Sequence, residues 1–224
     1  MRSLWRTLSR PILRNIALVC LADGVVGLSY GAIAVSKGFE LWVPVVLAIA
    51  VLAGAAELLF VGIVASGGSV FAAMAAGLLV NARHLPFGVA VRDVIGSGWR
   101  RVLGSHVMND ESVVFALSQQ QADKRKAAFW ICGVGILICW PVGAFVGGLI
   151  GGSIGDTDVF GLDAMFPTVL LALVLPSLKD RRTRLAVIAG AVIAVATTPL
   201  LPAGMPVLLS LIGLIFTAGK NRGS

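Results

Sequence analysis

Two long stretches of this chain contain no charged residue. They run from Ala127 to Ile154 and from Leu185 to Gly219. A helix needs about 20 apolar residues to cross the hydrocarbon core of a bilayer, so each stretch is long enough for at least one crossing. Hydrophobic residues make up 58% of the chain and charged residues only 13%, which leaves too little polar surface to cover several such helices in water. The sequence therefore predicts an all-α polytopic membrane protein.

The apolar residues fall into six blocks. The last block is long enough to fold back on itself, and Pro199, Pro202 and Pro206 supply the turn. This arrangement predicts about seven transmembrane segments, with short halves on either side of a Pro-rich turn that is buried in protein. The blocks are 16–36, 41–65, 69–91, 127–152, 159–178 and 185–219.

We expect residues 1–224 to form a single transmembrane domain. Two stretches in it, "SVFAAMAAGLLVNARHLPFG" and "RLAVIAGAVIAVATTPLLPAG", each join a small-residue helix to a polar segment that ends in Pro and Gly. This similarity predicts two inverted three-helix repeats plus a final helix, with discontinuous helices. The expected parts are a basic surface segment (1–15), a first helical unit (16–91), a basic cytoplasmic linker (92–126) and a second helical unit with the last helix (127–219).

The basic residues indicate the orientation in the membrane. Lys and Arg gather in the linker 92–126 and near 179–184, whereas the loop 151–163 contains Asp but neither Lys nor Arg. Because cytoplasmic loops collect Lys and Arg, the linker and the C-terminus are expected on the cytoplasmic side of the cell membrane. The net charge of +7 is explained in this way and does not indicate a nucleic-acid partner.

The arginines near the N-terminus would lie on the opposite side if all seven segments cross. They would return to the cytoplasmic side if one early segment enters the membrane and turns back. Two segments are candidates: 16–36, with a break at Asp23-Gly24, and 69–91, with a break in "LLVNARHLPFG". The sequence leaves both open.

Polar residues inside the apolar blocks are candidates for function, because each buried charge costs several kcal/mol unless it is paired or hydrated. Arg83 cannot lose its proton and so needs a permanent partner. Its planar donors suit a carboxylate, which Glu57, Asp110 or the substrate would supply. His84 is suited to move a proton near neutral pH or to make a structural hydrogen bond.

Glu57 lies in "VLAGAAELLFVG", far from any other charge in sequence. We expect it to be protonated, paired with Arg83, or directed into a water-filled cavity. A carboxyl that alternates between neutral and charged forms can carry a proton across a transporter.

A third polar cluster lies in "SHVMNDESVVFALSQ", residues 105–119. His106 and Asp110 stand four residues apart and would share one face of a helix. Asn109, Asp110 and Glu111 before an apolar run are also typical of a helix start. A gate or a substrate-site role for this segment is a third possibility, besides the shared helix face and the helix start. Its His, Asp and Glu spacing matches no established metal site, and we expect neither a metal nor a cofactor.

At these residues the chain resembles the AzlC family, the membrane subunits of branched-chain amino acid exporters. The resemblance extends over nearly the whole chain. It is carried by "ADGVVGLSYGAIA" (22–34), "AGAAELLFVGIVASGGS" (53–69), "LLVNARHLPFG" (78–88), "HVMNDES" (106–112), "GLDAMFPTVLLALVLP" (161–176) and "TTPLLPAGMPVLL" (197–209).

The resemblance implies a permease of the cytoplasmic membrane with seven segments. It implies a small hydrophobic partner of the AzlD type, export of valine, leucine, isoleucine and sometimes methionine, and a proton gradient as driving force. The positions that the family shares most closely correspond to Asn81, Arg83, His84, Asp110 and Glu111. One departure is that the family usually has Gln where this chain has Glu57, an exchange of a neutral amide for an acid that could change substrate or coupling.

The sequence thus favours a secondary exporter of branched-chain or similar small apolar amino acids, and not an enzyme, because no motif of a hydrolase, metalloprotease or ATPase occurs. A homo-oligomer is compatible with it. A non-transporting membrane scaffold and a channel are the rival functions. We predict substrate contacts from Arg83, Asn81, Glu57 and Asp110, and proton coupling by Glu57, His84, Asp110 and Glu111.

Overall fold

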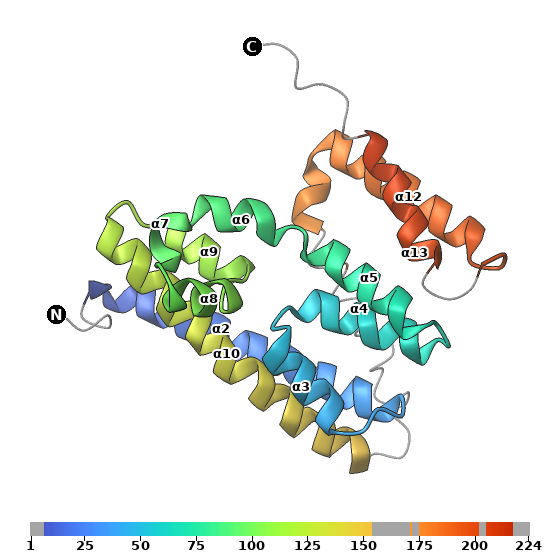
Figure 1. Cartoon of the computed structure of the whole chain (residues 1–224), viewed down its shortest axis with the longest axis horizontal. Helices are drawn as coiled ribbons and strands as arrows, with labels where there is room; N and C mark the ends of the chain where they lie inside the picture. Colours follow the sequence, from blue (N-terminus) through green and yellow to red (C-terminus); the bar gives the residue numbers. More distant parts are fainter. Residues whose placement is uncertain (1–6, 154–170, 172–174, 202–204, 217–224) are drawn as a thin grey trace. The chain divides into compact units, whose positions relative to one another are not determined.

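The computed structural model describes residues 7–153, 171, 175–201 and 205–216, and within them every regular element is a helix (Figure 1). This confirms the predicted all-α class. The α-helices are α2 (Arg10–Ser36), α3 (Trp42–Ala50), α4 (Gly54–Ala65), α5 (Val70–Asn81), α6 (His84–Ala90), α7 (Arg92–Ile95), α8 (Trp99–His106), α9 (Asp110–Leu117), α10 (Ala122–Ser153), α12 (Arg181–Thr197) and α13 (Met205–Leu209), and the 3-10 helices are η2 (Leu175–Lys179) and η3 (Ser210–Phe216).

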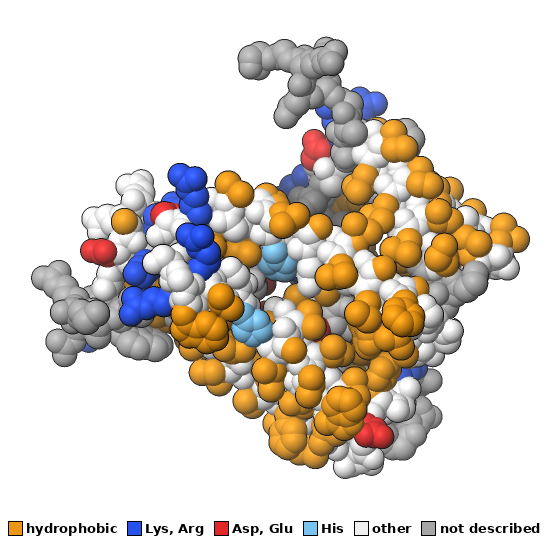
Figure 2. Space-filling view, in the orientation of Figure 1, with side chains coloured by type: hydrophobic (Ala, Val, Ile, Leu, Met, Phe, Trp, Pro, Cys, Tyr) orange, Lys and Arg blue, Asp and Glu red, His pale blue; other side chains and the backbone are white. Residues whose placement is uncertain are grey.

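Three helical stretches of the described chain are long and apolar enough to cross a membrane: Arg10–Ser36, Val70–Ala90 and Ala122–Ser153. Two shorter apolar helices, Gly54–Ala65 and Met205–Ile215, accompany them. Apolar side chains also cover much of the visible surface (Figure 2). Phe71, for example, is 83% exposed. Such a surface needs a bilayer rather than water around it, and the protein is a polytopic membrane protein.

The chain divides into two compact units. Unit 1 consists of Met1–Glu57 and Val80–Leu162, and unit 2 of Leu58–Leu79 and Asp163–Ser224. All the polar residues predicted for the site belong to unit 1. The predicted pair of inverted repeats stays a prediction.

Helix α2 begins earlier than the first apolar block. It starts at Arg10, with Pro11 in its first turn, and continues without a break to Ser36. Proline is tolerated in a first turn because its missing N–H has no partner inside the helix there. The candidate break at Asp23-Gly24 is therefore wrong, and the basic surface segment 1–15 stays a prediction.

The second apolar block is divided where the sequence predicted one continuous segment. Helix α3 ends at Ala50 and α4 begins at Gly54. Between them Leu52 has a φ of 50°, a left-handed conformation that is uncommon for a leucine. Glu57 therefore lies in the first turn of α4, not in the middle of a span.

The block 69–91 does contain a break. Helix α5 ends at Asn81, Ala82 and Arg83 form a turn, and α6 begins at His84. Of the two candidate interruptions, this one is confirmed.

Unit 1 is built around close packing of α2 against α10. Glycines that stand four residues apart in the sequence, Gly27 and Gly31 on α2 and Gly143 and Gly147 on α10, lie at this contact. A Cβ on Gly31 would overlap the carbonyl oxygen of Ala144, and a Cβ on Gly147 would overlap that of Leu28. The backbones of the two helices are in direct contact here. Small residues allow this close approach and so stabilise the packing of membrane helices.

The basic linker folds into three short helices: α7 and α9 pack on α10, and α8 packs on α7. Its Lys and Arg side chains gather at one end of unit 1 (Figure 2). Arg125 binds Asp93 through Nε and Nη2, at 3.1 and 3.2 Å. A buried apolar cluster lies beneath and consists of Val91, Val94, Ile95, Val107, Met108, Val113, Ala116 and Phe129.

In unit 2 the last apolar block folds back, as predicted. Helix α12 packs against η3, and a Cβ on Gly190 would lie 2.6 Å from the carbonyl oxygen of Ser210. Most of the fifth block, 159–178, lies outside the described residues.

Candidate functional site

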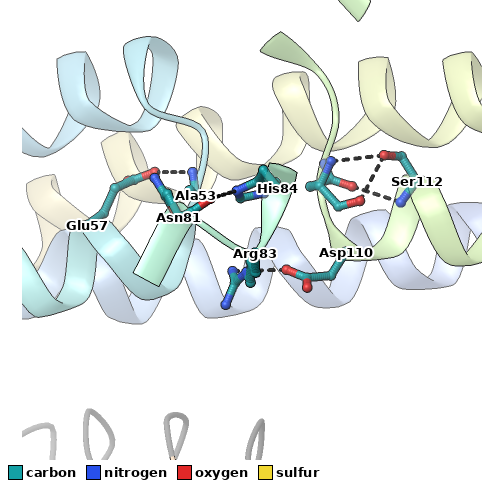
Figure 3. A network of polar contacts seen from close by, with 8 residues as sticks. Ala53, Glu57, Asn81, Arg83, His84, Asp110 and Ser112 are labelled. Atoms are coloured by element: carbon teal, nitrogen blue, oxygen red, sulfur yellow. Dashed lines mark hydrogen bonds and ion pairs between the residues drawn. The ribbon is translucent and has the colours of Figure 1, made fainter. Parts of the chain in front are cut away.

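Arg83 and Asp110 form the centre of the site. Arg83 lies in the turn between α5 and α6, and its Nη2 is 2.9 Å from Oδ2 of Asp110, the first residue of α9 (Figure 3). Both side chains are partly exposed, at 35% and 43%. The sequence left Glu57 and Asp110 as alternative partners of Arg83, and the structure selects Asp110.

Two buried polar atoms at the same turn have no hydrogen-bond partner among the described residues. They are Nε of Arg83, a donor, and Oδ1 of Asn81, an acceptor. His84 is tied to this turn through Nδ1, which lies 3.0 Å from the backbone oxygen of Asn81, and its ring meets Phe87 edge-on at 5.9 Å. The turn thus presents one free donor and one free acceptor beside an ion pair, and buried groups of this kind are satisfied by a ligand or by water.

Asp110 is placed by the start of α9. Asn109 caps this helix: its Oδ1 accepts from the backbone N–H of Ser112 at 2.8 Å, and its own N–H donates to the Ser112 hydroxyl at 3.0 Å. The helix start predicted at Asn109 is confirmed. His106 ends α8 and does not share a helix with Asp110, so the predicted common face is wrong.

Two further carboxyls lie near the ion pair. Glu111 follows Asp110 on α9, and Asp23 of α2 interacts electrostatically with both of them. One oxygen of Asp23 is buried and has no hydrogen-bond partner in the described part of the chain. Asp23, Asp110 and Glu111 thus form a group of neighbouring carboxyls, of which Asp110 pairs with Arg83. In the sequence, Asp23 was considered only as part of a candidate break in the block 16–36.

Helix α9 is not among the helices long enough to span, and its Glu111 is half-buried. Burial raises the pKa of the Glu111 carboxyl above its usual value, the Asp110 carboxylate raises it further, and Arg83 lowers it. Neutral Glu111 is thus favoured in the folded protein more than in the unfolded chain.

Replacing Glu111 with glutamine is expected to flatten the pH dependence of stability and to stabilise the protein at neutral pH. Because the pKa is raised on folding, the proton on Glu111 stabilises the fold below the unfolded value of about 4.3. This stabilisation is lost as the pH rises through the folded pKa. Thermal unfolding in detergent from acid to neutral pH measures it, with exposed Glu40→Gln as control. Equal pH slopes for wild type and Glu111→Gln would contradict the prediction.

Glu57 does not join the Arg83 pair. It is 1% exposed and has partners of its own: Oε1 accepts from the Ala53 N–H at 2.9 Å and Oε2 from the Trp140 Nε1–H at 3.0 Å. The close view shows Glu57 directed to Ala53, while Arg83 is directed to Asp110 (Figure 3). The expected Glu57–Arg83 pair is wrong, because the break before α4 turns the carboxyl back onto its own helix start.

Sequence reasoning missed Trp140 and Tyr30, which lie beside Glu57 and form a second polar group with it. Tyr30 is the only tyrosine of the chain, and its ring stacks on Trp140 with centroids 5.5 Å apart. A signal existed, because a lone tyrosine inside a long apolar segment needs a partner for its hydroxyl. Within the described residues, no group of three or more His, Cys, Asp or Glu side chains could hold a metal ion.

Comparison with known proteins adds to this geometry. The chain is 23% identical to the branched-chain amino acid transport protein AzlC of Bacillus subtilis over 87% of its own length and 78% of that protein. It is 24% identical to an uncharacterized membrane protein of Helicobacter pylori, with 85% of each chain covered. No solved structure matches it. The model of the family described as AzlC protein matches residues 18–154, more than half of the chain. The chain belongs to the AzlC family.

Proposed function

We propose that this protein is a secondary transporter that exports branched-chain or similar small apolar amino acids across the cytoplasmic membrane, driven by protons. Its membership of the AzlC family supports a role in membrane transport. The branched-chain amino acid transport protein of Bacillus subtilis, to which the chain is similar, supports branched-chain amino acids as the substrate class.

The observation that carries the proposal is the pair of unsatisfied polar atoms beside the Arg83–Asp110 ion pair. A free amino acid is a zwitterion, and it needs a donor for its carboxylate and an acceptor for its ammonium group. Arg83 Nε supplies the donor and Asn81 Oδ1 the acceptor, two residues apart on the same turn. A branched aliphatic side chain would then lie against apolar neighbours of the turn.

The Arg83–Asp110 ion pair links the binding of substrate to the movement of a proton. A substrate carboxylate competes with Asp110 for the guanidinium of Arg83, because both are planar acceptors of the same donors. Displaced Asp110 is then free to hold the ammonium group or to take a proton. His84 and Glu111 lie within the same turn-and-helix arrangement and are the further proton-carrying candidates, and Glu57 is a separate one.

We place the basic end of unit 1, formed by the linker helices, on the cytoplasmic side, in accordance with the positive-inside rule. A small AzlD-type membrane subunit is the proposed partner. Exposed apolar side chains on α2, α5 and α10 leave ample surface for a partner or for lipid.

Purified protein in liposomes tests the function. Vesicles loaded with labelled leucine should release it faster when a pH gradient is imposed, with the small subunit present, and release should saturate with leucine concentration. Glycine and lysine serve as control substrates that lack the apolar side chain. Downhill, non-saturating flux would indicate a channel. Absence of flux under any gradient, with fold and partner verified, would favour the scaffold and refute the proposal.

A further inference from the structure

Glu57 is buried in unit 1, away from the Arg83–Asp110 ion pair, and we call its buried surroundings, with Ala53, Tyr30 and Trp140, the Glu57 pocket. Its carboxyl has one neutral N–H donor on each oxygen, from Ala53 and from Trp140. Among the described residues it makes no ion pair. A carboxylate buried to this extent without a cation costs several kcal/mol, and two N–H donors offset only part of that cost.

Tyr30 is the third member of the pocket. Its side chain is completely buried on α2, and its hydroxyl has no hydrogen bond with a described residue. The hydroxyl nevertheless interacts electrostatically with the Glu57 carboxyl, and the Tyr30 ring lies flat on the Trp140 indole that donates to the same carboxyl. The pocket therefore contains an unused hydroxyl, able to donate or accept, beside an acid.

No other charged group faces this carboxyl from the described elements around it. Helix α3 contains no titratable side chain, and α4 contains none besides Glu57. On α10, Trp140 contacts the Glu57 carboxyl. The neighbouring titratable residue, Cys139, lies against Gly24 of α2 instead. The proton on Glu57 thus depends on Tyr30 and on the two N–H donors.

These groups satisfy both protonation states of Glu57. The carboxylate can accept from Ala53, Trp140 and the Tyr30 hydroxyl. The carboxylic acid can keep both N–H contacts through its two oxygens and donate its O–H to the Tyr30 oxygen, after that hydroxyl rotates. A glutamine has only one acceptor oxygen, so its NH₂ group would face one of the two N–H donors. The pocket therefore suits an acid that gains and loses a proton, and does not suit an amide.

We propose that Glu57, Tyr30 and Trp140 form a reversible proton-binding site, and that its protonation loosens the joint between α3 and α4. The hydrogen bond from the Ala53 N–H to the charged Glu57 carboxylate holds the segment between α3 and α4 in place. This segment includes Leu52, whose backbone is in the left-handed conformation. Charge-assisted hydrogen bonds are about twice as strong as neutral ones, so proton uptake weakens the tie. The link to substrate movement rests on the proposed transport function, whereas proton binding itself does not.

The chain contains only three glutamates, Glu40, Glu57 and Glu111, so labelling glutamate with ¹³C at the side-chain carboxyl isolates the signal. Infrared pH-difference spectra of the full chain in nanodiscs, without substrate, should show a protonated-acid band. One component of this band should persist in Glu40→Gln and Glu111→Gln and vanish in Glu57→Gln, separate from the component that Glu111 contributes and that vanishes in Glu111→Gln. Loss of the first component in Glu40→Gln or Glu111→Gln, or its persistence in Glu57→Gln, would overturn the proposal.

Tyr30→Phe provides a second readout that does not require Glu57→Gln to fold, because it keeps both acceptor oxygens and the ring stack. The acid carbonyl band should shift to higher frequency, as expected when its O–H loses an acceptor. An unchanged band would show that Tyr30 is not a partner. If the band behaves as expected but leucine flux ignores the pH gradient, the proton site stands and the proposed coupling fails. If no flux occurs at all, the transport proposal alone fails.

Discussion

Replacing Arg83 with alanine is expected to remove leucine transport almost completely. The change deletes the free Nε donor proposed for the substrate carboxylate and leaves Asp110 without its partner at 2.9 Å. Hydrogen bonds to charged groups contribute about 1.5–3 kcal/mol, so the apparent affinity for leucine should fall by about 10- to 100-fold. Saturation curves of flux in liposomes, with direct leucine binding by calorimetry, measure the loss.

Control variants separate binding from folding. Arg83→Lys keeps the charge but not the planar fork, and it should recover only part of the affinity. Arg92→Ala removes an exposed arginine of α7 and should leave transport unchanged. Because the Arg83–Asp110 pair is more than a third exposed, its own contribution to stability is small, and Arg83→Ala should unfold close to the wild-type temperature. Wild-type affinity in Arg83→Ala would refute the proposed substrate contact.

The second large effect is expected at the contact of α2 with α10. In Gly147→Ala the new Cβ would overlap backbone atoms of Leu28, and neither helix can yield without separating from the other. Overpacking of this kind costs about 1–3 kcal/mol, and more where the obstacle is backbone. We expect a clearly lower unfolding temperature in detergent and less monodisperse protein.

Gly152→Ala is the matched control on the same helix. Its Cβ would meet only Cγ1 of Val35 at 3.5 Å, an ordinary contact. Since alanine favours a helix over glycine by about 0.5–1 kcal/mol, this variant should be as stable as wild type or slightly more so. Similar unfolding temperatures for the two variants would contradict the α2–α10 packing.

Much of the fold follows from the sequence because its signals are local. Uncharged runs as long as a bilayer crossing predict membrane helices, and "LLVNARHLPFG" predicts the break between α5 and α6. The cap at Asn109 is equally local, since the hydrogen bonds join residues three apart. The break between α3 and α4 was missed because no proline marks it, and a leucine takes the left-handed conformation there.

The candidate site was predicted as a set of residues but not as a set of pairs. Arg83, Asn81, His84, Asp110, Glu111 and Glu57 were all chosen because polar groups inside apolar segments cost free energy unless satisfied. The same reasoning gave no means of choosing between Glu57 and Asp110 as the partner of Arg83. The structure pairs Arg83 with Asp110 and gives Glu57 other partners.

By itself, then, the sequence determined that this is a helical membrane protein and which of its polar residues need partners. Only the tertiary structure decided the partners. Glu57 meets Trp140 across 83 positions of the chain, and Tyr30 reaches the same pocket from α2. Such pairings depend on which faces two distant helices present to each other, and here that is set by the glycines that let α2 and α10 touch. No local pattern encodes that contact, so the separation of the Arg83–Asp110 ion pair from the buried Glu57, Tyr30 and Trp140 emerges only when the helices pack.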